Sequence, residues 1–411
     1  MDNNLEYDES QLINSRGART CRSEFRFDPY SGKWALIAEG RDDRPSNTEE
    51  TSNSKDLTPV SDFDPRCPFC VGAESETPET VARASCKGGD DSSVLYEIVN
   101  HPTELEKTNR PWSVRVFENK YPVFRLNEVK STELSFLEVA NRFENLTEST
   151  SRRFFQNVPS QGRHEVIVDS PLHRRSWGEF SDVEIKLTFR VFRSRLRVLR
   201  NSFRFAYSFV FKNVGANAGA SQRHTHCQLT GMTRLPDVIR SELERLQRYE
   251  SERTSKRELR SFWDALLDAE LEAKERVVYA SERFVVYCPY ASRFPMQVEI
   301  CPRIDAKFED YDDSDVDELA VLSRDVARAL EETKRRKTTK DLSPLDYNVL
   351  LKNAPSNVDL SLREGAKAAR PRWIFLPSIV KKAGYEIGSE IDVNPISPET
   401  AARLLRETLF F

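Results

Sequence analysis

The chain has 411 residues, of which 31% are charged, and its formal net charge is −4. Because an ordinary domain has roughly 100–200 residues, this length predicts two or three folding units. The weakly negative charge gives no electrostatic reason to bind nucleic acid, and no run approaches the ~18 apolar residues of a membrane span. Neither a nucleic acid nor a membrane is therefore an expected partner.

The N-terminal region begins with a polar segment, residues 1–22, which we expect to be disordered and which has no hydrophobic core of a signal peptide. Residues 25–37 have the pattern of a strand, a tight turn and a second strand, and the polar residues 46–62 predict a linker. Seven cysteines, an odd number in a long chain, argue against a disulfide framework. We therefore expect a cytoplasmic protein.

A Cys-x-x-Cys pair, Cys67 and Cys70, follows the linker. No strand–helix–strand pattern surrounds it, which disfavours a thioredoxin-like redox pair, whereas two reduced cysteines without a ligand stay an alternative. Structural zinc needs four nitrogen or sulfur ligands, so a zinc site would take its other ligands from distant segments. The candidates are His173 and His224, which we favour, and His101 and His164, which compete with them.

An internal repeat is the main clue to the architecture. In the first copy a strand at 164–169 is followed by a helix whose start has the capping-box pair Ser181 and Glu184, and then by a strand at 207–211. Apolar residues of this helix recur at steps of four and three, and they are Ile185, Phe189, Phe192, Leu196 and Leu199. The second copy repeats this order with a strand at 296–300, a helix beginning near residue 314 and a strand at 347–351, and a Lys-Asn pair ends the last strand of each copy. The pattern predicts an α+β fold in which a duplicated unit packs its helix across an antiparallel sheet.

Residues 237–275 separate the two copies and are rich in charge. Interspersed leucines and a phenylalanine predict solvated helices with one buried stripe, and this segment gives no reason to expect a partner.

The stretch at residues 213–228 is the most informative part of the chain. Side chains alternate along a strand, so His224, His226 and Gln228 should project from one face. The glycines and alanines just before them carry almost no bulk, which lets a phosphate approach the backbone. This combination predicts a site at which histidine handles a phosphate.

His226 is the candidate nucleophile. A neutral imidazole can attack phosphorus and form a labile phosphoramidate, from which a second acceptor takes the nucleotidyl group. Gln228 and Ser221 could donate hydrogen bonds to the phosphate oxygens as charge shifts in the transition state. Two ordinary strand histidines, or two ligands of one metal, are the alternatives for the His-x-His pair. The second copy has no histidine at residues 371–375, so we expect only the first copy to carry the chemistry.

Residues 213–228 fit every fixed position of the pattern N-x-G-A-x-x-G-x-S-x-x-H-x-H-x-Q. This segment resembles the active-site strand of the galactose-1-phosphate uridylyltransferase family, a branch of the histidine-triad superfamily. Further motifs occur in family order at residues 27–34, 41–45, 67–70, 116–122, 162–173 and 384–388. The resemblance covers residues 23–410. It implies a histidine-triad-like catalytic domain with a zinc site at 23–235 and a second such domain with a helical insertion at 236–411.

The resemblance also implies a role for individual residues. It gives Zn²⁺ the ligands Cys67, Cys70, His173 and His224, and it makes His226 the residue that becomes nucleotidylated, with Gln228 and Ser221 beside the α-phosphate. The nucleotide and its phosphates would lie near Arg41, Arg44, Phe117, Asn119, Asn213 and Gly219. The hexose would be held by Tyr385 and Glu386, in this family often across the interface of a homodimer.

The implied reaction is a ping-pong transfer of UMP from UDP-glucose to a hexose 1-phosphate, a step of galactose metabolism. Two departures keep the base and the acceptor open, because Thr225 and Cys227 replace the proline and glycine of the usual H-P-H-G-Q. The looser motif is also similar to the ADP-glucose phosphorylase branch, which transfers AMP to phosphate. A nucleotide-binding protein whose catalysis has decayed is the third hypothesis.

Overall fold

The computed structural model describes residues 23–27, 34–38, 62–87, 95–100, 112–125, 157–201, 205–255, 260–337 and 343–409. The segment 1–22, most of the linker at 46–62, and both Arg41 and Arg44 lie outside the described residues. The chain forms two compact units, residues 1–45 with 120–164 and residues 46–119 with 165–411. The expected boundary between two domains, 23–235 and 236–411, stays a prediction.

The first unit contains a small antiparallel sheet of three strands, β1 (Ser23–Phe27), β2 (Trp34–Ala38) and β6 (Asn157–Pro159), in the order β2-β1-β6. The two strands predicted within residues 25–37 are thus confirmed, and Phe25 pairs with both Leu36 and Val158.

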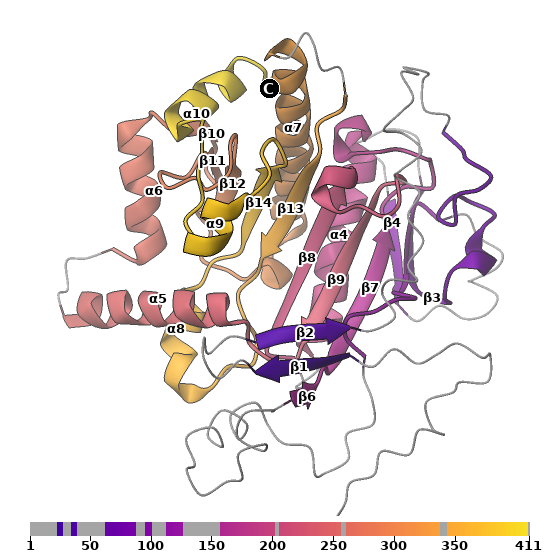
Figure 1. Ribbon diagram of the computed structural model, residues 1–411, viewed down its shortest axis with the longest axis horizontal. Helices are drawn as coiled ribbons and strands as arrows, with labels where there is room; N and C mark the ends of the chain where they lie inside the picture. The colour runs from indigo at the N-terminus through magenta and orange to yellow at the C-terminus, as the bar shows by residue number, and fades with distance from the viewer. Residues whose placement is uncertain are drawn as a thin grey trace, which may run out of the picture. The chain divides into compact units, whose positions relative to one another are not determined.

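The second unit is built on a sheet of eleven strands in the order β10-β11-β12-β14-β13-β8-β9-β7-β5-β3-β4 (Figure 1). In chain order, the first four strands of this sheet are β3 (Thr80–Lys87), β4 (Leu95–Asn100), β5 (Val114–Glu118) and β7 (Gly162–Val168). The others are β8 (Tyr207–Val214), β9 (His226–Met232), β10 (Val277–Ala280), β11 (Phe284–Tyr287), β12 (Val298–Pro302), β13 (Tyr347–Lys352) and β14 (Arg372–Pro377).

The sheet consists of two halves with the same topology, which confirms the duplication expected from the sequence. Outward from the centre the first half runs β8-β9-β7-β5-β3, and the second runs β13-β14-β12-β11-β10. A long helix connects corresponding strands in each half, namely α4 (Asp182–Arg200) between β7 and β8, and α7 (Asp313–Lys337) between β12 and β13. The halves meet where β8 pairs antiparallel with β13, with Tyr347 opposite Val214. The predicted α+β fold class is confirmed.

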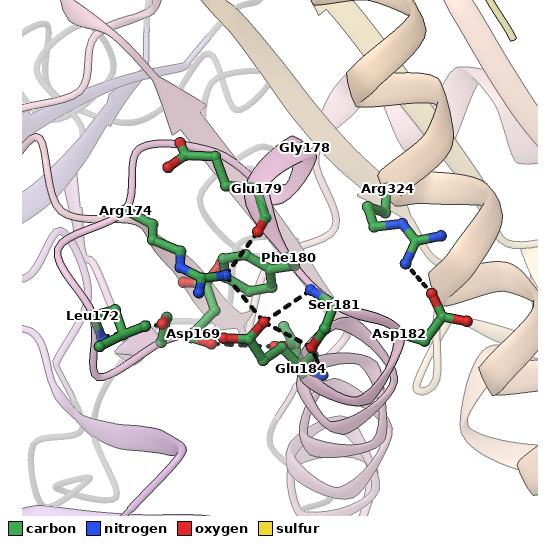
Figure 2. Close-up of polar contacts among 12 residues, drawn as sticks. Asp169, Leu172, Arg174, Gly178, Glu179, Phe180, Ser181, Asp182, Glu184 and Arg324 are labelled. Carbon is green, nitrogen blue, oxygen red and sulfur yellow. Dashed lines mark hydrogen bonds and ion pairs between the residues drawn. The ribbon is translucent and has the colours of Figure 1, made fainter. Parts of the chain in front are cut away.

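The two long helices share the main hydrophobic core with the sheet. All five residues of the predicted stripe on α4 are buried there together with the apolar face of α7. The predicted capping box is present as well: Ser181 accepts a hydrogen bond from the Glu184 amide, and Glu184 accepts one from the Ser181 amide (Figure 2). Ion pairs from Arg190 to Asp313 and Asp317 join α4 to α7.

The remaining helices follow the first half or lie near the C-terminus. They are α5 (Asp237–Ser255), α6 (Phe262–Ala273), α8 (Arg363–Ala368), α9 (Gly384–Ser389) and α10 (Pro398–Arg406). The predicted helices of the charged segment are thus α5 and α6, and Leu243 and Leu246 of its apolar stripe are buried.

The repeated Lys-Asn pairs are not equivalent in space. Lys212 is buried on the same side of its strand as the core residues Val210 and Val214, whereas in β13 the core-facing residues are Tyr347, Val349 and Leu351. Lys352 therefore points to the opposite face of the sheet, because neighbouring side chains alternate. The two copies match in topology, but their strands are offset by one position at these lysines.

Candidate functional site

Four buried side chains with metal-binding atoms meet at one point. Cys67 and Cys70 lie in a loop of turns at residues 62–73, His173 lies in the loop after β7, and His224 precedes β9. Their ligand atoms all lie within 4.8 Å of one another. The Nδ1 atom of His224 is 3.5 Å from both cysteine sulfurs, and His173 Nδ1 is 3.5 Å from Cys70 Sγ.

The chemistry and spacing of this group fit a structural zinc ion. Tetrahedral zinc with two sulfur and two nitrogen ligands keeps each sulfur about 3.5 Å from each nitrogen. Burial lowers the pKa of His224 to about 4, so its imidazole is neutral, which is the form that coordinates a metal. Its other nitrogen, Nε2, lies 2.8 Å from the carbonyl oxygen of Ser170 and can donate a hydrogen bond that orients the ring.

Backbone hydrogen bonds bring these distant loops together. The amide of His173 donates to the carbonyl of Asp62 over 2.7 Å, and the amide of Thr225 donates to the carbonyl of Arg174 over 2.7 Å. The Arg174 side chain in turn donates to the carbonyl of Glu179 and to the carboxylate of Glu184 (Figure 2). The start of α4 thereby anchors the loop that carries His173.

His226 and Gln228 lie on β9 beside this cluster, and both are 6% exposed. The Nδ1 atom of His226 lies 2.8 Å from the carbonyl oxygen of His224. Because a carbonyl only accepts, Nδ1 carries the proton, which leaves Nε2 with the lone pair that a nucleophile needs. The ring of Phe69, between the two cysteines, contacts the imidazole edge to face with 5.2 Å between centroids.

Two of the predicted nucleotide-binding residues lie close to this strand. The amide of Asn119 donates to Gln228 over 3.4 Å, and the ring of Phe117 packs against Phe69 with 5.8 Å between centroids. The structure therefore places Asn119 against Gln228 of β9, and Phe117 against Phe69, which in turn contacts His226. Arg41 and Arg44 lie outside the described residues.

The small loop between β8 and β9 is held in a fixed shape. Gly215 and Gly219 have φ angles of 83° and 81°, which favour glycine. The carboxylate of Asp346 accepts hydrogen bonds from the backbone and side chain of Asn217, each over 2.9 Å.

The predicted phosphate-binding residues lie at the ends of this loop. Asn213 donates to the carbonyl of Gly219 over 3.4 Å, and Asn348 of the second half donates to Asn213 over 2.9 Å. Ser221 lies in the same loop, partly exposed, before the two histidines. The loop therefore presents small residues and polar groups next to β9, as the sequence predicts.

The predicted hexose-binding residues lie elsewhere in the chain. Tyr385 is 61% exposed on α9, and Glu386 accepts a hydrogen bond from the Ala383 amide at the start of the same helix. Neither side chain contacts the described residues of the cluster around His226 through a hydrogen bond or ion pair. Several further apolar side chains around α9 are exposed: Ile379, Val380, Ile387, Ile391 and Val393.

Sequence reasoning missed three polar residues under the site. Lys212, Asp169 and Thr225 are buried and hydrogen-bonded to one another behind the strand that carries His226. Two features of the sequence could have indicated this network. One is the single lysine, Lys212, in an apolar strand, and the other is the polar Thr225 where the family motif has proline. Sequence reasoning also missed the contact of Phe69 with His226. The position of Phe69 between two candidate metal ligands was the signal that could have indicated it.

The second half replaces the histidine with an arginine. Cys227 and Leu229 of β9 face the core, as do Trp373 and Phe375 of β14, so the first residues of the two strands, His226 and Arg372, are counterparts. Arg372 forms ion pairs with Glu299 over 3.0 Å and with Glu242 over 3.5 Å, and Lys352 also pairs with Glu242. That only the first copy carries the chemistry stays a prediction.

Comparisons with known proteins agree with the sequence motifs. The model of the family "Galactose-1-phosphate uridyl transferase, N-terminal domain" matches residues 99–236. An ADP-glucose phosphorylase of Arabidopsis thaliana is 26% identical over 389 residues, covering 93% of this chain and 92% of that protein. A probable galactose-1-phosphate uridylyltransferase of Drosophila melanogaster is 23% identical over 393 residues, covering 93% and 94%.

The fold is shared with solved structures. The crystal structure of an Arabidopsis thaliana ADP-glucose phosphorylase with bound ADP-glucose superposes with a TM-score of 0.60 at 22% identity, covering 94% of this chain and 99% of that one. The family model and the related sequences confirm that the chain resembles the galactose-1-phosphate uridylyltransferase family, and an ADP-glucose phosphorylase is among its relatives. Among the described residues, no helix is both long enough and apolar enough to cross a membrane.

Proposed function

We propose that this chain is a nucleotidyltransferase that acts as a UDP-glucose–hexose-1-phosphate uridylyltransferase through a covalent intermediate on His226. The observation that carries the proposal is the hydrogen bond between His226 Nδ1 and the His224 carbonyl, at 2.8 Å. It fixes the tautomer whose Nε2 attacks phosphorus. The names of the related proteins support the same class of reaction.

The reaction consists of two displacements at the α-phosphorus. In the first, Nε2 of His226 forms a bond to the α-phosphorus of the nucleotide sugar, and the bond from that phosphorus to the bridging oxygen breaks. Hexose 1-phosphate leaves with the electron pair. In the second, a phosphate oxygen of the acceptor hexose 1-phosphate forms the new bond to phosphorus, and the bond to Nε2 breaks. His226 thus returns to its starting form, which is the logic of a ping-pong reaction.

The surrounding residues would bind and orient the substrate. Gln228 and Ser221 would donate to the phosphate oxygens, and the loop of Asn213 and Gly219 would let the phosphates approach the backbone. The nucleotide would lie against Phe117 and Asn119, with Arg41 and Arg44 as its further contacts. Because Tyr385 is exposed on α9 and Glu386 beside it is partly exposed, we place them at the hexose of a partner subunit in a homodimer.

Zinc is the metal that we propose for Cys67, Cys70, His173 and His224. When bound, it supplies folding energy and neutralises two thiolates, with no part in the displacement. These ligands hold the loop of Phe69 against β9, so they fix the wall of the site on which His226 lies. All six described cysteines are free of disulfides. A protein with this cysteine chemistry suits the cytoplasm, where thiols stay reduced.

The second candidate is an ADP-glucose phosphorylase that uses the same histidine. It is favoured by the 26% identity to the Arabidopsis enzyme and by Thr225 and Cys227 in place of proline and glycine. In that reaction the nucleotide on His226 is AMP, and inorganic phosphate is the acceptor.

The deciding experiment measures the intact mass of the protein after it is mixed with UDP-glucose or with ADP-glucose. A UMP-sized adduct supports the uridylyltransferase, and an AMP-sized adduct supports the phosphorylase. In His226→Ala we expect no adduct and a loss of turnover of at least about 1,000-fold, since the chemical group itself is removed.

His164→Asn is the matched control for this experiment. His164 is buried, and its Nδ1 accepts a hydrogen bond from the Val123 amide over 3.2 Å, which an asparagine oxygen can also do. We expect this variant to form the adduct normally. An unmodified wild type with both donors, or near-normal turnover in His226→Ala, would rule out the covalent mechanism.

A further inference from the structure

The two departures from the usual H-P-H-G-Q motif share one environment. Thr225 and Cys227 alternate with His226 and Gln228, so their side chains point to the core side of β9. Both are fully buried, at 2% and 0% exposure. Proline and glycine at these positions could offer no side-chain hydrogen bond, whereas a hydroxyl and a thiol can.

The group that the Thr225 hydroxyl meets is the buried ammonium of Lys212. Nζ of Lys212 lies 2.6 Å from the Thr225 hydroxyl, 2.9 Å from a carboxylate oxygen of Asp169 and 3.2 Å from the carbonyl oxygen of His226. An ammonium has three donors, and these three acceptors use all of them. Lys212 is 1% exposed, so every one of these contacts is shielded from water.

Asp169 closes the network from the end of β7. Its Oδ2 atom accepts from Lys212, from the indole of Trp177 over 2.7 Å and from the thiol of Cys227 over 3.4 Å. The Thr225 hydroxyl lies 3.3 Å from the same oxygen, so it can accept from Lys212 and donate to Asp169. The two replaced positions therefore both bind one buried ion pair.

This ion pair acts on the backbone of the candidate nucleophile. The carbonyl of His224 accepts from the imidazole of His226, the amide of Thr225 donates to Arg174, and the carbonyl of His226 accepts from Lys212. Thr225 and His226 are thus each held by a different part of the fold, Thr225 by the loop after β7 and His226 by β8. A buried ion pair is costly to desolvate and gives little net stability by itself, so its contact with this one carbonyl calls for another role.

We propose that the Lys212–Asp169 pair, with Thr225 and Cys227, positions the imidazole of His226 for attack on phosphorus. This inference rests on the function proposed above. Lys212 and Asp169 are positioning residues, since they act through the backbone of His226 and not on the substrate. Misplacing a reacting group by about 1 Å can slow a reaction about 100-fold, which sets the size of the expected effect.

The test compares variants that remove the network without leaving a lone buried charge. Thr225→Val keeps the shape and removes the hydroxyl, and Lys212→Met combined with Asp169→Asn removes both charges. At saturating nucleotide sugar we expect the first-order rate of adduct formation to fall about 10-fold in Thr225→Val and about 100-fold in the double variant. The affinity for the nucleotide sugar and the zinc content should stay unchanged, and Thr225→Ser should restore the rate.

Thr333→Val is the matched control, because Thr333 is a buried threonine of α7 whose hydroxyl donates to the Ala329 carbonyl over 2.7 Å. It should lose some stability and keep the wild-type rate. A purely structural role for the network predicts the same behaviour for Thr225→Val, with lower stability and an unchanged rate. That result would overturn the proposal.

A second readout separates this inference from the proposed function. The chain has only five histidines, so ¹⁵N–¹H spectra of the imidazoles can resolve the hydrogen-bonded Nδ1–H of His226. We expect that signal to shift or broaden in Thr225→Val while the signals of the metal-bound histidines stay in place. If the wild type forms no adduct with any nucleotide sugar, the proposed function is wrong, and an unaltered His226 signal in Thr225→Val refutes the positioning role independently.

Discussion

Cys67 and Cys70 lie next to two histidines that are more than a hundred residues away from them in the sequence. The sequence alone identifies the cysteine pair, because two thiols at this spacing can share one metal ion. It leaves four histidines as candidates for the other ligands, and only the fold decides among them. The structure brings together His173 and His224, whereas Nδ1 of His164 accepts a hydrogen bond from the Val123 amide and His101 lies outside the described residues.

The first prediction concerns the metal. Cys67→Ser should lower the zinc content and the thermal stability together, because a structural metal site contributes its binding energy to folding. Metal analysis and a thermal melt measure both quantities. Cys86→Ser is the control, since Cys86 is an exposed thiol outside the cluster and should leave both unchanged. An unaltered zinc content in Cys67→Ser would remove Cys67 from the ligand set.

At the scale of elements, the loop between β8 and β9 is the segment through which, in the proposed function, a phosphate approaches His226. Gly215 begins this loop with a φ angle of 83°, and a Cβ atom there would lie 1.8 Å from a carboxylate oxygen of Asp346. That carboxylate also binds Asn217 and pairs with Arg175 over 2.6 Å. It cannot withdraw without breaking these contacts.

The second prediction follows from this close approach. Gly215→Ala should destabilise the protein by about 1–3 kcal/mol and raise the KM for the nucleotide sugar, because the loop must move to admit the methyl group. Denaturant unfolding and steady-state kinetics measure the two effects. Gly388→Ala on α9 meets nothing within 4 Å and serves as the control for stability. If the two variants were equally stable, the loop could move to admit the methyl group without a loss of folding free energy, and the prediction would be wrong.

Some features of the helices and strands could be predicted from the sequence, and others could not. The helical stripe and capping box of α4 were predicted correctly, because spacing and local hydrogen bonding determine them. The matching Lys-Asn pairs suggested equivalent positions, yet Lys212 faces the core and Lys352 faces the other side. A shift of one residue changes the face of every side chain in a strand, and nothing local in the sequence reveals it. A lone lysine in the apolar strand β8 is a local signal, but only the fold shows that Lys212 faces the core.

The two halves of the eleven-stranded sheet differ at the first residue of corresponding strands. His226 begins β9 beside the cluster of Cys67, Cys70, His173 and His224, and Arg372 begins β14 and pairs with Glu299 and Glu242. The neighbouring carboxylates raise the pKa of Arg372, although burial by itself would lower it. A guanidinium held in this way carries no lone pair for attack on phosphorus, so we expect the proposed chemistry to belong to the first half alone.

The third prediction tests this difference between the halves by removing the ion pairs of Arg372 with Glu299 and Glu242. Arg372→Met leaves the buried carboxylate of Glu299 without its arginine, whereas Glu242 keeps Lys352, and it should lower the free energy of unfolding by about 3 kcal/mol. Adduct formation on His226 in the folded variant should stay within about threefold of wild type, since the loss lies outside the reacting group. Arg403→Met removes an exposed ion pair to Glu407 and should cost about 0.5 kcal/mol or less. A fall in the His226 rate as large as that in the Lys212 and Asp169 double variant would mean that the two halves are coupled, and the hydrogen-bonded pair of strands β8 and β13 is where they meet.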